Sequence, residues 1–424
     1  MTSHSFGHRS RQQAVACAAF VLSAGALLAA MSTGCGPGDD CQVTATCPTG
    51  STGNGGGTTS GGGAASGGAG AGTGGDASST GGGGGSGGGG VIDVQADQRI
   101  DGGDGHTCFI DFDGHVFCWG DNQNGQLGNG DFTNEPQPVA LGIDASRVAA
   151  GGAHSCAELG GTLRCWGMNA SGQLGVGNMS TQSLPTPVAS LSAVTAVGLG
   201  NAHSCALAAS GVWCWGDNAV GQLGTGNTGA SQDAPALTTV MAGHDVATGT
   251  RTSCAVDDSN AVLCWGQLPA IGPYPTPSAV SGVASATMVA TGESFACALL
   301  LDKTLRCWGE GGPPSPGINP VNPGLTNVIQ IAAGASHVCA LVEGGAVHCW
   351  GQNGYGQLGI GASPAQADPQ PVAAVSNAVS VGAGKDHTCA VISDDSVRCW
   401  GRNHRGQLGD GTYGDSDDPV MVQF

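Results

Sequence analysis

The sequence predicts an all-β fold, a seven-bladed β-propeller with four short antiparallel strands in each blade. One segment recurs seven times between Cys108 and Gly401, each time with a glycine, two cysteines and a Trp-Gly pair. The first cysteines of successive copies lie 42 to 50 residues apart, which suits a propeller blade and is too short for an independent domain. Each copy also contains four short strand-like segments separated by turn residues.

Residues 1–34 have the features of a signal peptide of the lipoprotein type. Two arginines precede an apolar run over residues 14–30, which is typical of a secretory signal and short for a membrane span. Cys35 ends a segment similar to a bacterial lipobox, although Ser32 occupies a position where an aliphatic residue is usual. We expect lipidation of Cys35. Ordinary cleavage, with Cys35 free or disulfide-bonded, is the alternative.

Residues 35–90 are predicted to form a disordered tether. From Thr49 to Gly90 the chain consists almost entirely of Gly, Ser, Thr and Ala, which cannot bury a core. A Gly-rich coil of about 40 residues has a root-mean-square reach of roughly 35 Å. Such a coil would hold a folded domain away from a membrane or act as a passive spacer. Cys41 and Cys47 could pair with each other, but the sequence does not separate this from other pairings.

Residues 91–424 contain the repeats and are predicted to form the propeller. In each unit one strand follows a proline, as at residues 138–141, and a second leads into the glycine of the repeat, as at residues 147–150. The two strands of a hairpin complete the unit. Segments 91–94 and 419–422 resemble the strand that follows a proline, so either end of the chain could supply the strand that closes the ring. Closure protects strand edges that an open array would expose.

The two cysteines of each repeat are predicted to form a disulfide across a β-hairpin. If Gly160-Gly161 is a two-residue turn, Cys156 faces Cys165 in a non-hydrogen-bonded pair. The Cα atoms of such a pair lie about 4.5 Å apart, within the disulfide range. In the longer hairpins a three-residue turn, as at residues 112–114, keeps the same register. The predicted pairs are Cys108 with Cys118, Cys156 with Cys165, Cys205 with Cys214, Cys254 with Cys264, Cys297 with Cys307, Cys339 with Cys349, and Cys389 with Cys399.

Metal binding and reduced thiols are the alternatives for these cysteines. A histidine lies two residues before the first cysteine in five copies, and cysteine and histidine both bind zinc. Zinc sites prefer cysteines two to four residues apart, however, and Thr252 and Phe295 replace the histidine in two copies that keep both cysteines. We therefore expect disulfides and no metal site.

Five units carry an asparagine and then Gly-Gln-Leu-Gly after the Trp-Gly pair, at residues 125–128, 172–175, 221–224, 356–359 and 406–409. With these turns, and with Gly-x-x-His-(Ser/Thr)-x-Ala-Leu strands, residues 91–424 closely resemble the regulator of chromosome condensation repeat family. The resemblance implies a seven-bladed β-propeller that serves as an interaction platform, and one bacterial relative inhibits β-lactamases in this way. The cysteine pairs resemble an addition in the secreted bacterial branch of the family.

Units four and five depart from this pattern. Residues 267–272 keep a remnant of the turn and residues 310–316 have lost it. We expect these two blades to carry different, proline-stiffened loops, which breaks the symmetry of one face.

We assign structural roles to the tryptophans and histidines that recur in the repeats. We expect the seven Trp-Gly tryptophans to fill the space between blades and the histidines to hydrogen-bond loop backbone. Ser155 beside His154 resembles part of a catalytic triad, but consecutive strand residues point to opposite faces. No phosphate-binding loop is present in the sequence. We therefore predict no enzymatic activity and no cofactor.

The composition restricts the partners and the compartment. The chain has 31 acidic against 12 Lys and Arg residues, a net charge of -19, which argues against nucleic-acid binding. The 18 cysteines, mostly in opposed pairs, indicate an oxidising compartment. With the signal sequence, this predicts an exported protein that is lipid-anchored in the bacterial cell envelope or secreted.

Phe132, Met179 and Tyr413 are the candidate partner-binding residues. They lie five residues after the leucine of Gly-Gln-Leu-Gly in units one, two and seven, which are neighbours in a closed ring. An apolar cluster inside a polar rim is typical of a binding surface, whereas packing of each side chain against its own loop is the alternative. The loop at residues 410–418 could hold calcium, or its aspartates are solvated turn residues. The rim residues are Asp131, Glu135, Asp415, Asp417 and Asp418.

The predicted function is that of a non-enzymatic interaction scaffold with a protein partner, or with a glycan as the alternative. A structural or adhesive role in the envelope is the second hypothesis. Guanine-nucleotide exchange, by analogy with the family, is the third, and the secretion signal, disulfides and acidic surface argue against it. A monomer is expected, attached to a membrane only through a lipid anchor.

Overall fold

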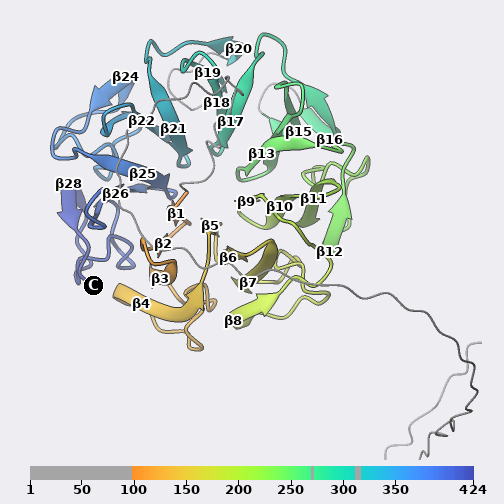
Figure 1. Ribbon diagram of the computed structural model, residues 1–424, viewed down its shortest axis with the longest axis horizontal. Helices are drawn as coiled ribbons and strands as arrows, with labels where there is room; N and C mark the ends of the chain where they lie inside the picture. Colours follow the sequence, from red (N-terminus) through yellow and green to blue (C-terminus); the bar gives the residue numbers. More distant parts are fainter. Residues whose placement is uncertain (1–97, 269–271, 311–316) are drawn as a thin grey trace, which may run out of the picture. The chain divides into compact units, whose positions relative to one another are not determined.

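The computed structural model describes residues 98–268, 272–310 and 317–424. The predicted signal peptide, Cys35, the tether, Cys41, Cys47 and segment 91–94 lie outside the described residues. Within the described ranges the chain forms seven four-stranded antiparallel sheets arranged as a ring (Figure 1). The predicted all-β, seven-bladed propeller is therefore confirmed.

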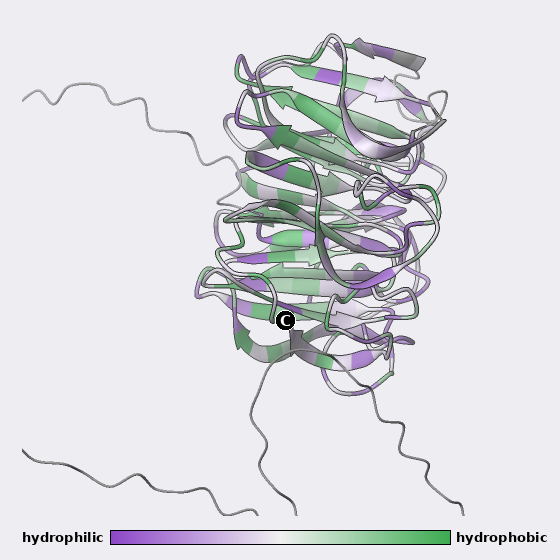
Figure 2. Ribbon diagram, turned by 90° about the vertical axis from the view of Figure 1, so that its right-hand side faces the viewer, coloured by the Kyte–Doolittle hydropathy of each residue, from purple (hydrophilic) through white to green (hydrophobic). Residues whose placement is uncertain are grey.

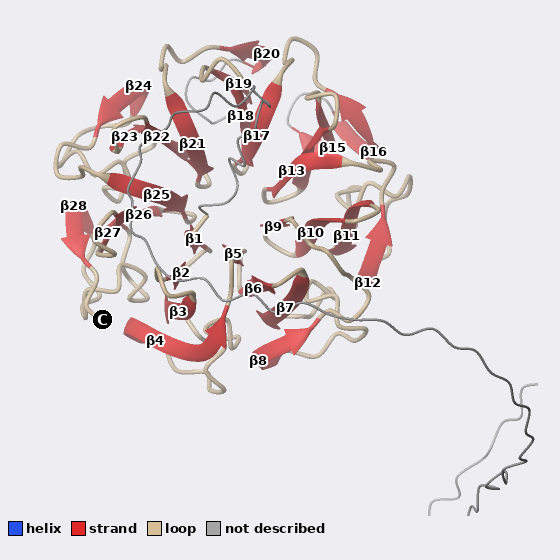
Figure 3. Ribbon diagram, viewed as in Figure 1, coloured by secondary structure: helices blue, strands red, loops and turns tan. Residues whose placement is uncertain are grey.

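Each blade is built from four consecutive strands, ordered from the centre of the ring to its rim (Figure 3). The innermost strands are β1 (Ile100–Gly102), β5 (Arg147–Ala150), β9 (Ala196–Leu199), β13 (Gly243–Thr248), β17 (Ala286–Thr291), β21 (Val328–Ala333) and β25 (Ala378–Ala383). The second strands are β2 (His106–Ile110), β6 (His154–Leu159), β10 (His203–Ala208), β14 (Thr252–Asp257), β18 (Phe295–Leu300), β22 (His337–Val342) and β26 (His387–Ile392). The third strands are β3 (His115–Gly120), β7 (Thr162–Gly167), β11 (Gly211–Gly216), β15 (Val262–Leu268), β19 (Leu305–Gly309), β23 (Ala346–Gly351) and β27 (Val397–Gly401). The outermost strands are β4 (Glu135–Asp144), β8 (Gln182–Pro187), β12 (Gln232–Leu237), β16 (Gly272–Ala279), β20 (Gly317–Val321), β24 (Gln366–Pro371) and β28 (Ser416–Met421).

The first and last blades close the ring without sharing a strand. β1 is the innermost strand of the first blade, and β28, the strand predicted near Pro419, is the outermost strand of the seventh. Side chains join the two blades instead. The Phe424 ring lies 5.5 Å from the Phe109 ring and 6.3 Å from the Trp119 ring, measured between centroids. Phe109 belongs to β2, whereas the six other blades have alanine at this position.

The predicted hairpin register is confirmed. Cys156 faces Cys165 and Leu159 faces Thr162 across the Gly160-Gly161 turn. Gly114 adopts a left-handed φ of 95° in the three-residue turn of the first blade. Both turn lengths therefore set the two cysteines of a hairpin opposite each other, as the sequence predicts.

All seven predicted disulfides are present in the described residues. Their Cα atoms lie 4.0 to 4.1 Å apart, and each bond joins the second and third strands of one blade. These disulfides indicate an oxidising environment. The bonded pairs are Cys108 with Cys118, Cys156 with Cys165, Cys205 with Cys214, Cys254 with Cys264, Cys297 with Cys307, Cys339 with Cys349, and Cys389 with Cys399.

The repeat glycine five residues before each first cysteine allows the blades to approach one another closely. A Cβ atom on Gly151 would lie 2.5 Å from the carbonyl oxygen of Gly200, and one on Gly200 would lie 2.4 Å from that of Gly249. No side chain tolerates such distances, so the ring of innermost loops requires glycine.

The hydrophobic core lies between neighbouring blades. Trp166 of the second blade is fully buried in a cluster with Cys108, Cys118 and Leu127 of the first. All seven Trp-Gly tryptophans are at most 1% exposed, so the prediction that they fill the space between blades is confirmed. In side view many strands carry hydrophobic segments, with hydrophilic segments among them (Figure 2). The described residues include no helix long and apolar enough to cross a membrane.

The antiparallel strand order gives the propeller two distinct faces. The loop between the first and second strands of every blade lies on the same face as the loop between its third and outermost strands, and we call this the turn face. The opposite hairpin face carries the turns between the second and third strands and the connections to the next blade. The Gly-Gln-Leu-Gly turns and all three candidate partner-binding residues therefore lie on the turn face.

Candidate functional site

The turn-face loops are held by the asparagine of each repeat. The buried Asn122 side chain accepts a hydrogen bond from the Leu127 backbone N–H at 3.0 Å and donates one to the Asp131 carboxylate at 2.8 Å. The same carboxylate accepts the backbone N–H of Thr133 at 3.0 Å. One buried amide thus fixes both ends of a long exposed loop, and its bond to the leucine N–H recurs at Asn169, Asn218, Asn353 and Asn403.

The asparagines present the candidate side chains outward. In the first loop Asn122 donates to the carbonyl of Asp131, the residue before Phe132, at 3.2 Å. In the seventh blade Asn403 donates to the carbonyl of Thr412, the residue before Tyr413, at 3.1 Å. In the second blade Asn169 donates to the carbonyls on both sides of Met179, at residues 178 and 180. The backbone next to each candidate side chain is therefore held by a hydrogen bond from a buried asparagine.

Phe132, Met179 and Tyr413 are 54%, 50% and 51% exposed. The Phe132 ring packs partly on its own loop: a Cβ on Gly125 would lie 3.3 Å from it. The three residues belong to separate loops of successive blades, and no ring contact joins Phe132 to Tyr413 among the described aromatic side chains. The structure thus places three half-exposed side chains along one sector of the turn face.

The acidic rim residues also organise the loops. Asp415 accepts the Asn403 backbone N–H at 2.7 Å and lies 3.4 Å from the His404 ring nitrogen. Asp410 accepts hydrogen bonds from the backbone and hydroxyl groups of Thr412. Carboxylates at residues 410 and 415 therefore act as turn residues, as the alternative to calcium binding expects.

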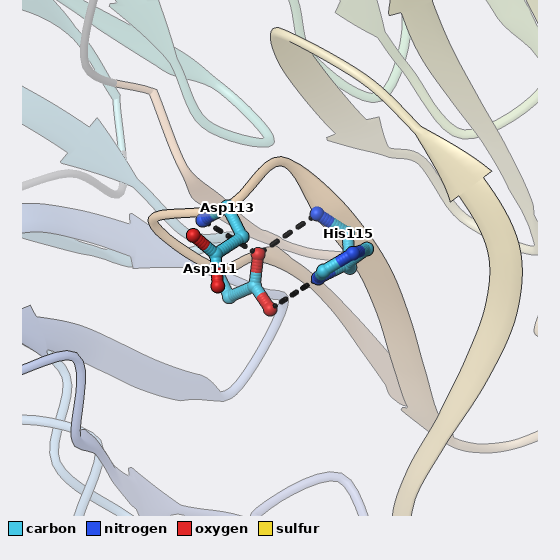
Figure 4. Close-up of side chains that lie close together, drawn as sticks. All are labelled: Asp111, Asp113 and His115. Atoms are coloured by element: carbon cyan, nitrogen blue, oxygen red, sulfur yellow. Dashed lines mark hydrogen bonds and ion pairs between the residues drawn. The ribbon is translucent and has the colours of Figure 1, made fainter.

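One group of possible metal ligands lies elsewhere in the described ranges. Asp111, Asp113 and His115 gather in the hairpin turn of the first blade (Figure 4). The Asp111 carboxylate accepts the backbone N–H groups of Asp113 and His115 at 3.0 and 2.8 Å and contacts the His115 ring at 2.9 Å. The bond to Asp111 raises the pKa of the exposed His115, and these hydrogen bonds account for the arrangement without an ion.

Hydrogen bonds between blades explain the repeated glutamine and tryptophan. The backbone carbonyl of Gln126 in the first blade accepts the Trp166 indole N–H and the Ser155 hydroxyl of the second, both at 2.9 Å. The carbonyls of Gln173, Gln222, Gln357 and Gln407 accept the corresponding groups of the blades that follow them. Each Gly-Gln-Leu-Gly turn therefore joins its blade to the next.

The repeat histidines join blades as well, which corrects the expectation that they bind loop backbone. His106 of the first blade lies 2.8 Å, through Nε2, from the Ser155 hydroxyl of the second. Because Ser155 donates its proton to the Gln126 carbonyl, His106 must donate here. The other pairs are His154 with Ser204, His203 with Ser253, His337 with Thr388 and His387 with Thr107.

The histidine and hydroxyl side chains of these pairs are fully buried. Burial lowers the pKa of His106, His154 and His387 to about 3, so the imidazoles are neutral at pH 7. Ser155 is fully buried and hydrogen-bonds to His106 of the preceding blade, not to His154 beside it. The triad-like pair in the sequence therefore consists of two residues with separate structural contacts.

The junction between blades four and five lacks this network. Thr252 of blade four stands where five other blades have histidine, and Ala296 of blade five stands where five other blades have serine or threonine. In place of the Gly-Gln-Leu-Gly turn, blade four pairs Gln267 with Pro273 between its third and outermost strands. Within the described residues the buried indole N–H of Trp308 consequently finds no acceptor.

Comparison of successive repeats gives a sequence signal for these pairs that no single repeat contains. Histidine is present in a blade only where the next blade carries serine or threonine. In the fifth blade Phe295 replaces histidine, and Val338 replaces the hydroxyl of the sixth. Joint loss of two residue types at equivalent positions of successive repeats indicates contact between them.

The centre of the ring is lined by small side chains. Two cavities lie in this centre, with volumes of about 140 and 220 Å³. They share lining residues that include Ala150, Leu199 and Thr291. Asp101 lines the smaller one, where its carboxylate accepts the backbone N–H groups of Ala150 and Gly102. Burial raises the pKa of Asp101 to about 7.

Comparison with known proteins identifies the repeats. Two patterns described as Regulator of chromosome condensation (RCC1) repeat match the chain, one at residues 113–157, 161–207, 210–256 and 344–391, the other at residues 98–126, 194–222, 328–357 and 378–407. Together they span more than half of the sequence.

Solved structures share the fold. The crystal structure of human WBSCR16 is 23% identical, with a TM-score of 0.64, over 73% of this chain and 94% of that one. Yeast RCC1 (Prp20), crystallised with Kap60 bound, is 21% identical with a TM-score of 0.64 over 73% and 84% of the two chains. A structure of Saccharomyces cerevisiae Prp20p, described with its binding properties to Gsp1p and histones, is 21% identical with a TM-score of 0.63 over 73% and 86%.

Proposed function

Because the chain belongs to the Regulator of chromosome condensation (RCC1) repeat family, we propose that it is an exported, non-enzymatic propeller that binds a protein partner through its turn face. One observation carries the proposal: Phe132, Met179 and Tyr413 are half-exposed on loops whose backbone is fixed by buried asparagines. A loop whose backbone is already fixed loses less conformational entropy on binding, which favours affinity.

The distribution of loops around the ring supports this assignment. Blades seven, one and two carry the long loops with large apolar side chains, whereas in the fourth blade Gln267 pairs directly with Pro273. A partner would therefore sit over one sector of the turn face. The disulfides, the signal-like N-terminus and the lipobox-like segment at Cys35 support export and anchoring to the cell envelope. Protein binding by Prp20p provides a precedent within the same fold.

Cross-linking and capture from cell-envelope extract tests the proposal. The wild-type protein is compared with a Phe132→Ala, Met179→Ala, Tyr413→Ala variant, which should lose its partner. The matched control changes three exposed residues of the hairpin face, Phe112→Ala, Met241→Ala and Leu301→Ala, and should retain it.

The two variants distinguish the hypotheses. Loss of one captured protein by the turn-face variant alone supports the proposal. Equal capture by both variants would contradict it, and the absence of any specific partner would favour a structural or adhesive role. Metabolic labelling with a radioactive fatty acid, compared between the native protein and Cys35→Ser, tests the anchor: label should enter only the native chain.

A further inference from the structure

We propose that the partner is anchored by an acidic segment bound at the seam of blades six and seven, where Tyr355, Arg402, His404 and Arg405 form a basic aromatic cluster. This rests on the proposed function, because it places one contact of the partner within the same turn face. We call these four residues the seam cluster.

The residue types that dominate binding hot spots gather at this seam. The chain has three tyrosines, and two of them, Tyr355 and Tyr413, lie in turn-face loops of blades six and seven. Tyrosine and arginine are enriched where binding energy concentrates, whereas lysine and acidic residues are depleted there. In a chain with 4% aromatic residues this concentration singles out one sector of the ring.

The side chains of the seam cluster are already arranged for binding. The Arg402 guanidinium lies 4.7 Å over the Tyr355 ring and 3.0 Å from the Asp386 carboxylate. The His404 ring meets Tyr355 edge-on at 6.2 Å between centroids. Stacking and ion pairing hold the tyrosine and arginine in place before a partner arrives, which lowers the entropic cost of binding.

Arg405 provides the cationic group that the fold itself leaves unpaired. It occupies the turn of blade seven at the position that Tyr355 occupies in blade six, and its stem packs over Gly105 of blade one. No carboxylate of the described residues lies within ion-pair distance of its guanidinium. Lys385, on the neighbouring loop, is 3.5 Å from Asp104, in an exposed pair that a partner can exchange.

The charge of the remaining surface favours an acidic ligand at this seam over the other sectors of the ring. Only ten lysines and arginines occur between residues 98 and 424, and three of them, Lys385, Arg402 and Arg405, lie in two turn-face loops of blade seven. The same loops contain Asp386, Asp410 and Asp415, and of the three cations only Arg405 lacks a carboxylate partner among the described residues. Guanidinium groups bind carboxylates through two parallel hydrogen bonds, so glutamate or aspartate side chains of a protein segment fit this site.

Fluorescence anisotropy with a labelled oligoglutamate peptide tests the inference on the full, oxidised chain. An oligoglutamine peptide of equal length is the neutral control. Arg405→Glu should weaken oligoglutamate binding at least about tenfold, and Arg405→Lys should weaken it less because the charge remains. Arg251→Glu, on the turn face of blade four, is the matched control and should leave binding unchanged.

Each remaining outcome counts against the inference. Failure of oligoglutamate to bind, or equal losses in Arg405→Glu and Arg251→Glu, would overturn it. Binding of an oligogalacturonate without binding of oligoglutamate would reassign the site to an acidic glycan. If the seam fails while the Phe132, Met179 and Tyr413 variant still loses its captured partner, the acidic segment is wrong and the proposed function stands.

Discussion

Two tryptophan-to-phenylalanine substitutions measure the hydrogen bonds that join the blades. Trp166 and Trp308 occupy equivalent positions and are 0% and 1% exposed, so each loses the same part of a buried ring. The comparison concerns the hydrogen bond of the indole N–H. The Trp166 indole N–H donates to the Gln126 carbonyl at 2.9 Å, whereas that of Trp308 has no acceptor in the described residues.

The expected difference in unfolding free energy follows from this contrast. Trp166→Phe removes a hydrogen bond worth about 0.5–1.5 kcal/mol, and Trp308→Phe removes a buried unsatisfied donor that costs about 1–3 kcal/mol. The packing loss is common to both and cancels in the comparison. We therefore expect Trp166→Phe to be less stable than Trp308→Phe by about 2 kcal/mol.

Differential scanning calorimetry under oxidising conditions measures this difference. For a propeller of this size, about 2 kcal/mol corresponds to about 3 °C in Tm. Thiol titration of both variants verifies that the disulfides are intact. Equal Tm values, or a lower Tm for Trp308→Phe, would refute the account of the seams.

Three further predictions concern the same framework. His106→Phe and Ser155→Val copy the natural Phe295 and Val338 pair. In denaturant unfolding, the double variant should lose about 1–2 kcal/mol less free energy of unfolding than the sum of the losses of the two single variants. Additive losses would show that the pair is not coupled. Stability should be full above about pH 6.5 and fall as the pH decreases toward 4, because burial lowers the pKa of five histidines to about 3 or 4 while the unfolded chain binds protons near 6.5. Each histidine changes the free energy of unfolding by up to about 1.4 kcal/mol per pH unit. Asp101, with its raised pKa, has the opposite effect on the pH dependence but is a single group. A melting temperature that is flat from about pH 7 to pH 4.5 would therefore contradict the burial of neutral histidines. Reduction should lower the Tm sharply, because each disulfide closes a loop of about ten residues worth roughly 2–3 kcal/mol, and an unchanged Tm with all thiols free would argue against this contribution.

Local patterns determined what the sequence could predict. The register that pairs Cys156 with Cys165 follows from turn length and the two-residue period of a strand, both of which lie within about ten residues of the chain. The ring follows from the repeated spacing of such hairpins. Contacts between blades were harder to predict, because His106 and Ser155 are 49 residues apart and belong to different sheets. Only their joint loss in later repeats indicates the pairing.

The candidate binding residues show where sequence reasoning ends. Their position in the repeat predicts that Phe132, Met179 and Tyr413 lie on neighbouring blades of one face, and the strand order agrees. Whether they form one patch depends on the path of each loop, which is set by hydrogen bonds from the repeat asparagines to backbone carbonyls. The structure leaves each of the three about half-exposed, and the seam cluster brings together side chains from two blades that no single repeat displays.

Peptide mapping by mass spectrometry without reduction tests the central claim most directly, namely that each blade is closed by its own disulfide in an oxidising compartment. Protein isolated from its native source with free thiols blocked should yield seven linked peptides, each joining the two cysteines of one hairpin, from Cys108 with Cys118 to Cys389 with Cys399. Blocked thiols at these positions, or links between cysteines of different blades, would contradict it.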